Sequence, residues 1–330
     1  MNGYQRYMAT LAGETVDYPA RTPILMQFAA EFIGSDYAAF ASDHRVLVEA
    51  NVACAREFGI DQLSCISDPY RETHGFGSKI TYVKNGPPHS THPLEQTKDL
   101  TVLSTPDPHR SERMLDRVKA AELYHRHHHG EHSILGWVEG PAAEAADLRN
   151  LMPFLIDLLD DEPFACELMD LCVETAIRFA RAQIEAGADT IGIGDAIASQ
   201  VGPDTYEELI QPREKRLVRA IQEMGGRVKL HICGNITHLL PGIADLGVDV
   251  LDVDHLVDLA TVRAAVGSKV AIAGNMDPVS VIRNGTPDSI REAVRNARDA
   301  AGFPYLVNAG CEIPSGTPAC NLRALCNPLG

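Results

Sequence analysis

Residues 227–275 read RVKLHICGNITHLLPGIADLGVDVLDVDHLVDLATVRAAVGSKVAIAGN and contain the strongest fold signal in the chain. Three short runs rich in Val, Ile and Leu, namely RVKLHIC, VDVLDV and KVAIAG, each close on polar residues. The gaps between them hold THLLPGIADLG and LATVRAAVG, which are each just long enough for one short helix. A strand, a crossover helix and another strand form the repeating unit of a parallel sheet. This stretch therefore predicts two consecutive βαβ units.

Four further runs of the same character flank that stretch, starting from about residue 60. They are QLSCISDPY (62–70), SILGWVEGP (133–141), DTIGIGDAI (189–197) and YLVNAGCEIP (305–314). Most are separated by enough chain for a crossover helix, and residues 152–186 have the apolar spacing of a helix pair. Seven strands that alternate with helices favour an α/β fold of the (β/α)8 TIM-barrel type over an open sheet. The eighth strand is not visible in the sequence.

The same rhythm predicts one TIM-barrel domain over residues 1–330. Residues 1–55 read as an N-terminal helical segment with a proline-containing stretch in its middle. Residues 70–132 interrupt the strand rhythm and are expected to form an insertion that carries a hairpin, as the βα loops of TIM barrels allow. The insertion ends in YHRHHHGEHS, whose histidines could bind a transition metal but are expected to lie in a solvated loop or to contact an acidic partner.

Composition excludes several classes of protein. The 330 residues are 45% hydrophobic and 22% charged, which suits a globular protein with a large core. Lys and Arg number 29 and Asp and Glu 45, so the net charge of −16 opposes binding to nucleic acid or to an anionic membrane. No window approaches the ~18 apolar residues of a membrane span, and the N-terminus lacks the pattern of a signal peptide. A cytoplasmic location is therefore expected.

The eight cysteines are expected to be reduced in that compartment, where disulfides are rare. Four of them follow helical apolar spacing or lie in a short C-terminal helix, and are expected to be packing residues: Cys166, Cys172, Cys320 and Cys326. Two carry no assignment: Cys54 and Cys65. The remaining two, Cys233 and Cys311, follow predicted strands and are candidates for chemistry.

The predicted strands end on polar residues, and in a parallel barrel the active site forms at those C-terminal ends. The residues concerned are Asp68, Glu139, Asp195, His231, Cys233, Asp252, Asp254, Asn275, Cys311 and Glu312. Any single acid among them could simply mark the point where polar residues resume after a strand. As a set they predict one site at the mouth of the barrel.

His231 and Cys233 form an H-x-C pair, and alternation along a strand directs residues two apart to the same face. Cys311 could supply a third ligand from a later strand. One His and two Cys with an open fourth position is a known catalytic zinc arrangement. The spacing alone also fits a histidine and two cysteines packed in a core, because the chain has no CxxC motif. Two thiolates would balance the zinc charge, and Asp254 or Glu312 could occupy the fourth position.

Three segments resemble the uroporphyrinogen decarboxylase superfamily: HICGN (231–235), AGNMDP (273–278) and NAGCEIPSGTPACNLRAL (308–325). The similarity extends over nearly the whole chain and is greater to the zinc- and corrinoid-dependent methyltransferase branch, which includes methylcobalamin:coenzyme M methyltransferases and components of O-demethylases. In that branch the H-x-C pair and the late cysteine bind zinc. The resemblance therefore implies Zn²⁺ at His231, Cys233 and Cys311, and a partner protein that carries a corrinoid (cobalamin).

The decarboxylase branch is the rival interpretation. It uses no metal, and it holds its tetrapyrrole partly with arginines in a segment that resembles residues 23–34. Here that segment reads PILMQFAAEFIG and contains no arginine. Asp68 matches the substrate-facing aspartate of the decarboxylases, but one carboxylate does not bind an octa-acid, and the net charge of −16 disfavours such a substrate. The resemblance therefore favours methyl transfer.

The resemblance implies transfer of a methyl group between a small methylated substrate, such as a methoxylated aromatic, and the cobalt of a corrinoid protein. The alternatives are transfer from a methylcorrinoid to a thiol or folate, a decarboxylase-like lyase, and a non-catalytic zinc or corrinoid carrier. Asp68, Glu139, Asp195 and Asn275 would orient the substrate. Helices around such barrels commonly support homodimers, so the resemblance leaves room for a homodimer without fixing the oligomeric state.

Overall fold

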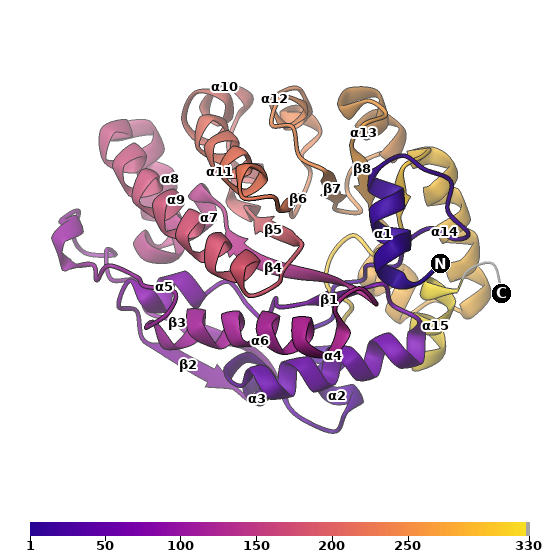
Figure 1. The fold of residues 1–330 in the computed structure, drawn as a ribbon. Coiled ribbons are helices and arrows are strands. Elements are labelled where there is room, and N and C mark those ends of the chain that lie inside the picture. Colours follow the sequence, from indigo (N-terminus) through magenta and orange to yellow (C-terminus); the bar gives the residue numbers. More distant parts are fainter. Residues whose placement is uncertain (328–330) are drawn as a thin grey trace.

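The computed structural model describes residues 1–327 and contains a curled parallel sheet of seven strands (Figure 1). Its strands, in sheet order, are β1 (Gln62–Ser64), β4 (Ser133–Glu139), β5 (Thr190–Gly194), β6 (Arg227–Ile232), β7 (Val250–Val253), β8 (Ala271–Ala273) and β9 (Tyr305–Leu306). Each pairs in parallel with the next, so that His231 of β6 lies beside Asp252 of β7. Nearly all of their residues are buried, which explains the continuous apolar runs. All seven predicted strands are confirmed.

Helices surround the sheet (Figure 1). They are α1 (Gly3–Leu11), α2 (Gln27–Phe32), α3 (Tyr37–Ser42), α4 (His44–Phe58), α5 (Arg71–Gly75), α6 (Glu112–His128), α7 (Pro141–Arg149), α8 (Leu151–Asp160), α9 (Glu162–Glu185), α10 (Pro203–Thr205), α11 (Gln211–Glu223), α12 (Leu240–Ala244), α13 (Leu259–Val266), α14 (Pro287–Ala301) and α15 (Ala319–Cys326). In α14, Thr286 caps the N-terminus, and Ile290, Val294 and Ala297 recur at helical spacing on the buried face. The predicted helix pair at residues 152–186 is confirmed as α8 and α9.

The two edges of the sheet are joined by a short N-terminal segment around Arg21. The Thr22 N–H donates to Val307 O at 2.9 Å, and the Val307 N–H donates to Ala20 O at 2.8 Å, next to β9. On the other side, the Asp61 N–H donates to Arg21 O at 2.9 Å, next to β1. The segment does not extend into a strand, because proline lacks the N–H that a ladder needs and Pro23 follows directly. Among residues 1–327 the sheet thus has seven strands, and the predicted count of eight is not confirmed.

The predicted insertion at residues 70–132 contains the expected hairpin, which is formed by β2 (Ile80–Val83) and β3 (Gly86–Ser90). It also contains α6, which packs on β4 and α9 and is the crossover helix between β1 and β4. The solvated-loop prediction for the histidine cluster was wrong for His125, His127 and His128. They form the last turn of α6, whose buried face extends to Tyr124.

The remaining sequence predictions about the chain have mixed outcomes. Cys166 and Cys172 lie on α9, as expected of packing residues, whereas Cys320 is exposed near the start of α15, so that its assignment to packing was wrong. None of the helices between residues 1 and 327 is long and apolar enough to cross a membrane.

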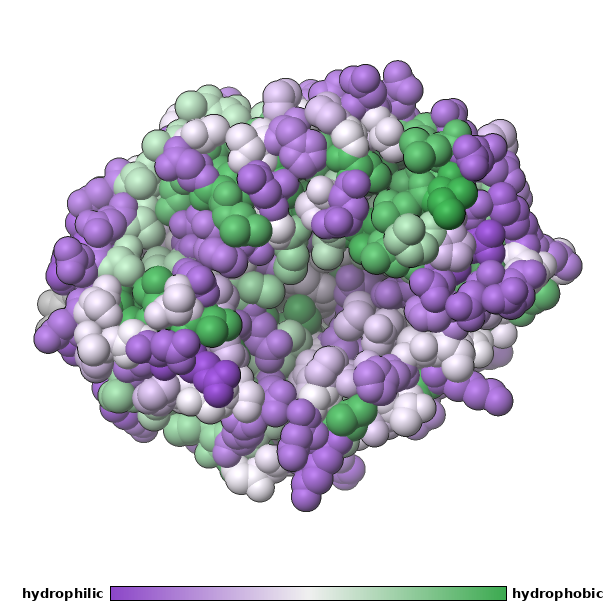
Figure 2. Space-filling model, turned by 180° about the vertical axis from the view of Figure 1, so that it is seen from behind, coloured by the Kyte–Doolittle hydropathy of each residue, from purple (hydrophilic) through white to green (hydrophobic). Residues whose placement is uncertain are grey.

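One domain over residues 1–330 stays a prediction, and its last three residues lie outside the described part. Figure 2 shows a largely hydrophilic surface with scattered apolar residues and a hollow near its middle.

Candidate metal centre and substrate pocket

Two strand ends that are far apart in the sequence bring one imidazole and two thiols together. β6 carries His231 near its C-terminal end, Cys233 follows that strand, and Cys311 follows β9. His231 Nε2 lies 3.0 Å from Cys233 Sγ, which lies 3.8 Å from Cys311 Sγ. All three candidate ligand atoms lie within 4.8 Å of one another. The structure therefore gathers into one cluster the residues that the resemblance assigns to zinc.

A buried charged layer orients the imidazole. His231 Nδ1 lies 3.2 Å from the backbone carbonyl oxygen of Asp252, so Nδ1 is the nitrogen that donates and Nε2 presents its lone pair to the thiols. The Asp252 carboxylate pairs with Lys229 Nζ at 2.8 Å and accepts from Asn308 Nδ2 at 2.8 and 3.0 Å. All three residues of this layer are buried. The layer therefore fixes which imidazole nitrogen faces the cluster.

The donor set suits Zn²⁺. Tetrahedral zinc with Zn–S bonds of about 2.3 Å separates two bound sulfurs by about 3.8 Å, which is the distance between Cys233 Sγ and Cys311 Sγ. The hydrogen bond from Cys233 is the main cause that lowers the pKa of Cys311 to about 4, so one sulfur is a thiolate at neutral pH. Thiolate and imidazole donors favour zinc over Mg²⁺ or Ca²⁺. Three ligands of this kind match catalytic zinc sites better than four-ligand structural ones.

The cluster lines a cavity of about 170 Å³ at the C-terminal end of the sheet. Its apolar lining comprises Ile24, Met26, Ile66, Pro69 and Trp137. Its polar lining comprises Asp68, Glu139, Glu312, His231, Cys233 and Cys311. An apolar cavity of about 150 Å³ in another protein holds one benzene molecule. The cavity beside the cluster therefore has room for one aromatic ring with small substituents.

Two glycines of β5 make room for the aromatic wall. A Cβ atom on Gly192 would lie 2.2 Å from the Trp137 ring, and one on Gly194 would lie 3.0 Å from Glu139 Oε2. The TIGIG run therefore serves side-chain packing at the pocket. Trp137 was not among the predicted site residues, although alternation along β4 places it on the same face as Glu139 and could have indicated it.

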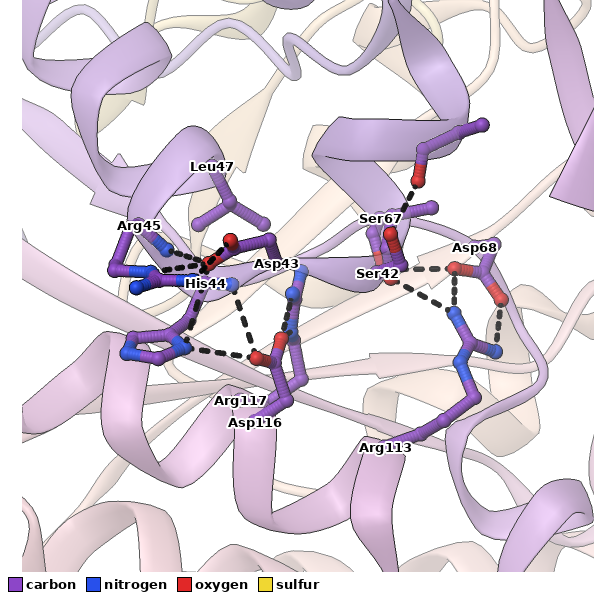
Figure 3. Close-up of polar contacts among 12 residues, drawn as sticks. Ser42, Asp43, His44, Arg45, Leu47, Ser67, Asp68, Arg113, Asp116 and Arg117 are labelled. Atoms are coloured by element: carbon purple, nitrogen blue, oxygen red, sulfur yellow. Dashed lines mark hydrogen bonds and ion pairs between the residues drawn. The ribbon is translucent and has the colours of Figure 1, made fainter. Parts of the chain in front are cut away.

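Asp68 lines the pocket and is held by a buried arginine (Figure 3). Arg113 reaches it from α6 through two hydrogen bonds, Nη1 to Oδ1 at 2.8 Å and Nη2 to Oδ2 at 2.7 Å. Ser67 Oγ and the Tyr70 N–H also donate to the carboxylate. Burial alone would raise the pKa of Asp68, but the charge and hydrogen bonds of Arg113 outweigh burial and hold this pKa below its usual range. Asp68 is thus an ionised, fully hydrogen-bonded group of the pocket wall.

Glu139 lies at the end of β4, and one of its two carboxyl oxygens accepts hydrogen bonds from neighbouring side chains. Its Oε1 accepts from Arg71 Nη2 at 2.6 Å and from Trp137 Nε1 at 3.2 Å. Burial raises the pKa of Glu139 well above that of an ordinary glutamate, and it outweighs the attraction of Arg71. Because Glu139 lines the pocket, it is a polar group that a bound molecule meets. Neither Arg71 nor Arg113 was predicted as a site residue, since both lie in the segment interpreted as an insertion.

The two candidates for a fourth zinc ligand differ in position. Glu312 lines the pocket next to Cys311, and its Oε1 accepts from the Gln27 N–H at 3.0 Å. Burial raises the pKa of Glu312 to about 7. The Asp254 carboxylate instead accepts from the Gly234 N–H at 2.9 Å and from the Leu256 N–H at 3.0 Å. Asp254 therefore holds the loop after Cys233, whereas Glu312 is the candidate that faces the pocket.

Asp195 and Asn275 do not line the pocket. The Asp195 carboxylate accepts from the Ala143 N–H at 2.7 Å at the start of α7. Asn275 Nδ2 donates to the backbone carbonyls of Asp254 at 3.1 Å and Val257 at 2.6 Å. The expectation that these two side chains orient substrate therefore does not fit their contacts, which stabilise a helix start and a loop.

A second group of titratable side chains, Asp43, His44 and Asp116, lies at the start of α4 (Figure 3). His44 Nδ1 lies 2.8 Å from Asp116 Oδ1. Both carboxylates already pair with arginines, Asp43 with Arg45 and Asp116 with Arg117. The charges of this group are therefore balanced without a metal ion.

Buried carboxyl groups lie behind the pocket wall. Glu72 and Glu144 are each 1% exposed, and Glu72 Oε2 and Glu144 Oε1 have no hydrogen-bond partner among the described residues. Burial raises the pKa of Glu144, and burial together with the charge of Glu72 raises the pKa of Asp147 to about 8. Asp147 is therefore largely protonated in the folded protein at neutral pH.

This proton contributes to the pH dependence of stability. Asp147 keeps its proton up to about pH 8 when folded and loses it near pH 4 when unfolded, so unfolding releases a proton between these values. We expect the free energy of unfolding to fall as the pH rises from 5 to 8. Asp147→Asn should flatten this fall by at most about 1.4 kcal/mol per pH unit. Urea denaturation at several pH values measures the slope, and identical slopes for the variant and the parent chain would refute the assignment.

Comparison with known proteins agrees with this geometry. The family model described as uroporphyrinogen decarboxylase (URO-D) matches residues 2–328. A methylcobamide:CoM methyltransferase MtbA of Methanosarcina mazei is 33% identical over 256 residues, which cover 77% of this chain and 74% of that protein. The uroporphyrinogen decarboxylase of Chloroflexus aurantiacus is 27% identical over 344 residues, which cover 97% of this chain and 94% of that protein. A solved methyltransferase from Methanosarcina mazei has a TM-score of 0.91 at 24% identity and covers 99% of this chain and 98% of its own.

The chain belongs to the uroporphyrinogen decarboxylase (URO-D) family. Its methyltransferase relatives identify it as an enzyme of the methyltransferase kind. The predicted resemblance to this family and to its methyltransferase branch is confirmed.

Proposed function

We propose that the chain is a zinc-dependent methyltransferase that moves a methyl group between a small methylated substrate and the cobalt of a corrinoid on a partner protein. The observation that carries this proposal is the clustering of His231, Cys233 and Cys311 in the wall of a cavity that has room for one ring. The names of the Methanosarcina relatives, which are methylcobamide:CoM methyltransferases, support the corrinoid as one of the two methyl carriers.

A methoxylated aromatic is the proposed methyl donor. Bound zinc would supply a Lewis acid that polarises the ether oxygen. Trp137 and Ile66 supply an apolar surface for the ring, and Glu139 supplies a polar group that faces the ligand. In this reaction the C–O bond would break, the Co(I) of the partner's corrinoid would supply the electron pair of the new Co–C bond, and the departing phenolate would take up a proton. His231, Cys233 and Cys311 would hold the zinc ion, while the side chains of the pocket wall position the ring.

Methyl transfer from a methylcorrinoid to a thiol is the second candidate, and the activity named for the Methanosarcina relatives favours it. A decarboxylase-like function has less support. Residues 23–34 offer no arginine to bind the carboxylates of a four-ring substrate. The proposal therefore favours methyl transfer, in either direction, over the lyase.

An anaerobic spectroscopic assay tests the proposal. The zinc-loaded chain is mixed with Co(I) cobalamin and a panel of methoxylated phenols and methylamines, and the cobalamin spectrum is followed. We expect conversion of the Co(I) spectrum to that of methylcobalamin with one equivalent of demethylated product, and no conversion with chelator-treated protein. Release of CO₂ from uroporphyrinogen without any methylation of cobalamin would refute methyl transfer and restore the lyase.

A further inference from the structure

We propose that the methyl-bearing substrate is an uncharged phenolic ether with one ring, and that the pocket rejects ligands with a carboxylate or sulfonate. This inference rests on the proposed function. Among the described residues that line the cavity, none is a lysine or an arginine. Recognition of a carboxylate or sulfonate inside a protein ordinarily uses such a cation, because a buried anion is costly unless it is paired.

The two arginines that contact carboxyl groups of the pocket wall are already paired with them. Arg113 gives two hydrogen bonds to Asp68, and Arg71 gives one to Glu139. Both guanidinium groups are buried, with side-chain exposures of 4% for Arg113 and 1% for Arg71. Each would have to leave a buried carboxylate without its partner in order to bind an anionic ligand, and that exchange is strongly unfavourable.

The groups that do reach the cavity are acidic. Asp68, Glu139 and Glu312 line it beside two cysteines, and only the first two are paired with arginines. An incoming anion would therefore meet the ionised Asp68 and two further carboxyl groups, with no lysine or arginine in the lining to pair with it. Like charges placed opposite one another suppress the wrong ligands at binding sites. The charge distribution of the wall thus selects against anions.

The same wall offers hydrogen-bond acceptors to an uncharged donor. Oε1 of Glu139 and Oε1 of Glu312 receive hydrogen bonds from described residues, whereas Oε2 of each receives none. A phenolic hydroxyl next to the methoxy group is a donor that matches such an acceptor. Coenzyme M, which the names of several relatives include, carries a sulfonate, for which the described lining offers no counterion. A neutral methoxyphenol therefore fits this pocket better.

A matched pair of substrates tests the inference. 2-Methoxyphenol and 4-hydroxy-3-methoxybenzoate differ only by a carboxylate, and both are offered to the zinc-loaded chain with Co(I) cobalamin. We expect kcat/KM to be at least about 100-fold higher for 2-methoxyphenol, because binding the benzoate places its charge against an acidic wall without a counterion. Values within tenfold of each other, or efficient methylation of coenzyme M by methylcobalamin, would overturn the inference and leave methyl transfer intact.

Two variants at the half-buried Met26 sharpen this test. Met26→Lys introduces a cation into the lining and should narrow the ratio of the two kcat/KM values at least about tenfold. Met26→Leu, the matched control, should keep the ratio of the parent chain. An unchanged ratio in Met26→Lys would contradict charge as the cause. If no substrate turns over, only the proposed function is refuted. Calorimetry then measures binding of the same two compounds. Tighter binding of 2-methoxyphenol upholds the inference, and equal binding overturns it.

Discussion

Alanine at both His231 and Cys233 is expected to leave the purified protein with less than about 0.1 zinc per chain, because two of three ligands are gone and a single thiolate binds zinc weakly. Methyl transfer should fall at least about a thousandfold, since the polarising centre is lost. The metal is measured by mass spectrometry on protein purified without a histidine tag, and activity is measured with Co(I) cobalamin. The fold should persist, because both side chains lie at the surface of a cavity.

The exposed thiol of Cys320 provides the matched control for that double variant. Cys320→Ala should retain the zinc content and the activity of the parent chain, because Cys320 lies on α15 and outside the cluster. Full zinc content in the His231→Ala, Cys233→Ala double variant would show that the ion binds elsewhere, for example among the histidines at the end of α6. Circular dichroism of both variants separates loss of metal from loss of fold.

Arg113→Met is expected to lower the free energy of unfolding by about 3–5 kcal/mol, the usual cost of removing one partner of a buried ion pair. The reason is the Asp68 carboxylate, whose side chain is 0% exposed and which would lose two short hydrogen bonds. Activity should fall as well, since Asp68 lines the pocket. Denaturant unfolding followed by fluorescence of the single tryptophan, Trp137, measures the change.

Arg110→Met is the matched control for this loss of charge. Arg110 has a side-chain exposure of 87% and contacts Asp107 at the surface, so that its replacement should change stability by no more than about 0.5 kcal/mol. If Arg113→Met were as stable as Arg110→Met, then the pair of Asp68 and Arg113 would not stabilise the pocket wall.

The strands of the sheet could be predicted because their signal is local. A buried parallel strand is a continuous run of Val, Ile and Leu, and all seven runs became strands. The segment around Arg21 gave no such signal, because it joins the sheet by a single bridge before Pro23. Its role depends on β9 and β1, which lie about 285 and about 40 residues away along the chain.

The candidate site could be predicted only in part, because position at a strand end does not determine where a side chain points. Glu139 shares the face of Trp137, whereas Asp195 comes one residue after Gly194 and turns towards α7. Arg71 and Arg113 could not be predicted, since they contact Glu139 and Asp68 of the pocket wall from helices in an irregular segment. Pairing between distant parts of the chain, which periodicity does not encode, determined these contacts.

X-ray absorption at the zinc edge of the zinc-loaded chain tests the central claim most directly. The proposed ligands, His231, Cys233 and Cys311, predict two sulfur neighbours at about 2.3 Å and one imidazole nitrogen at about 2.0–2.1 Å. Cys311→Ser should reduce the sulfur count from two to one. A zinc spectrum with only nitrogen and oxygen neighbours, or one that Cys311→Ser leaves unchanged, would contradict a zinc centre in the pocket and the methyltransferase function proposed from it.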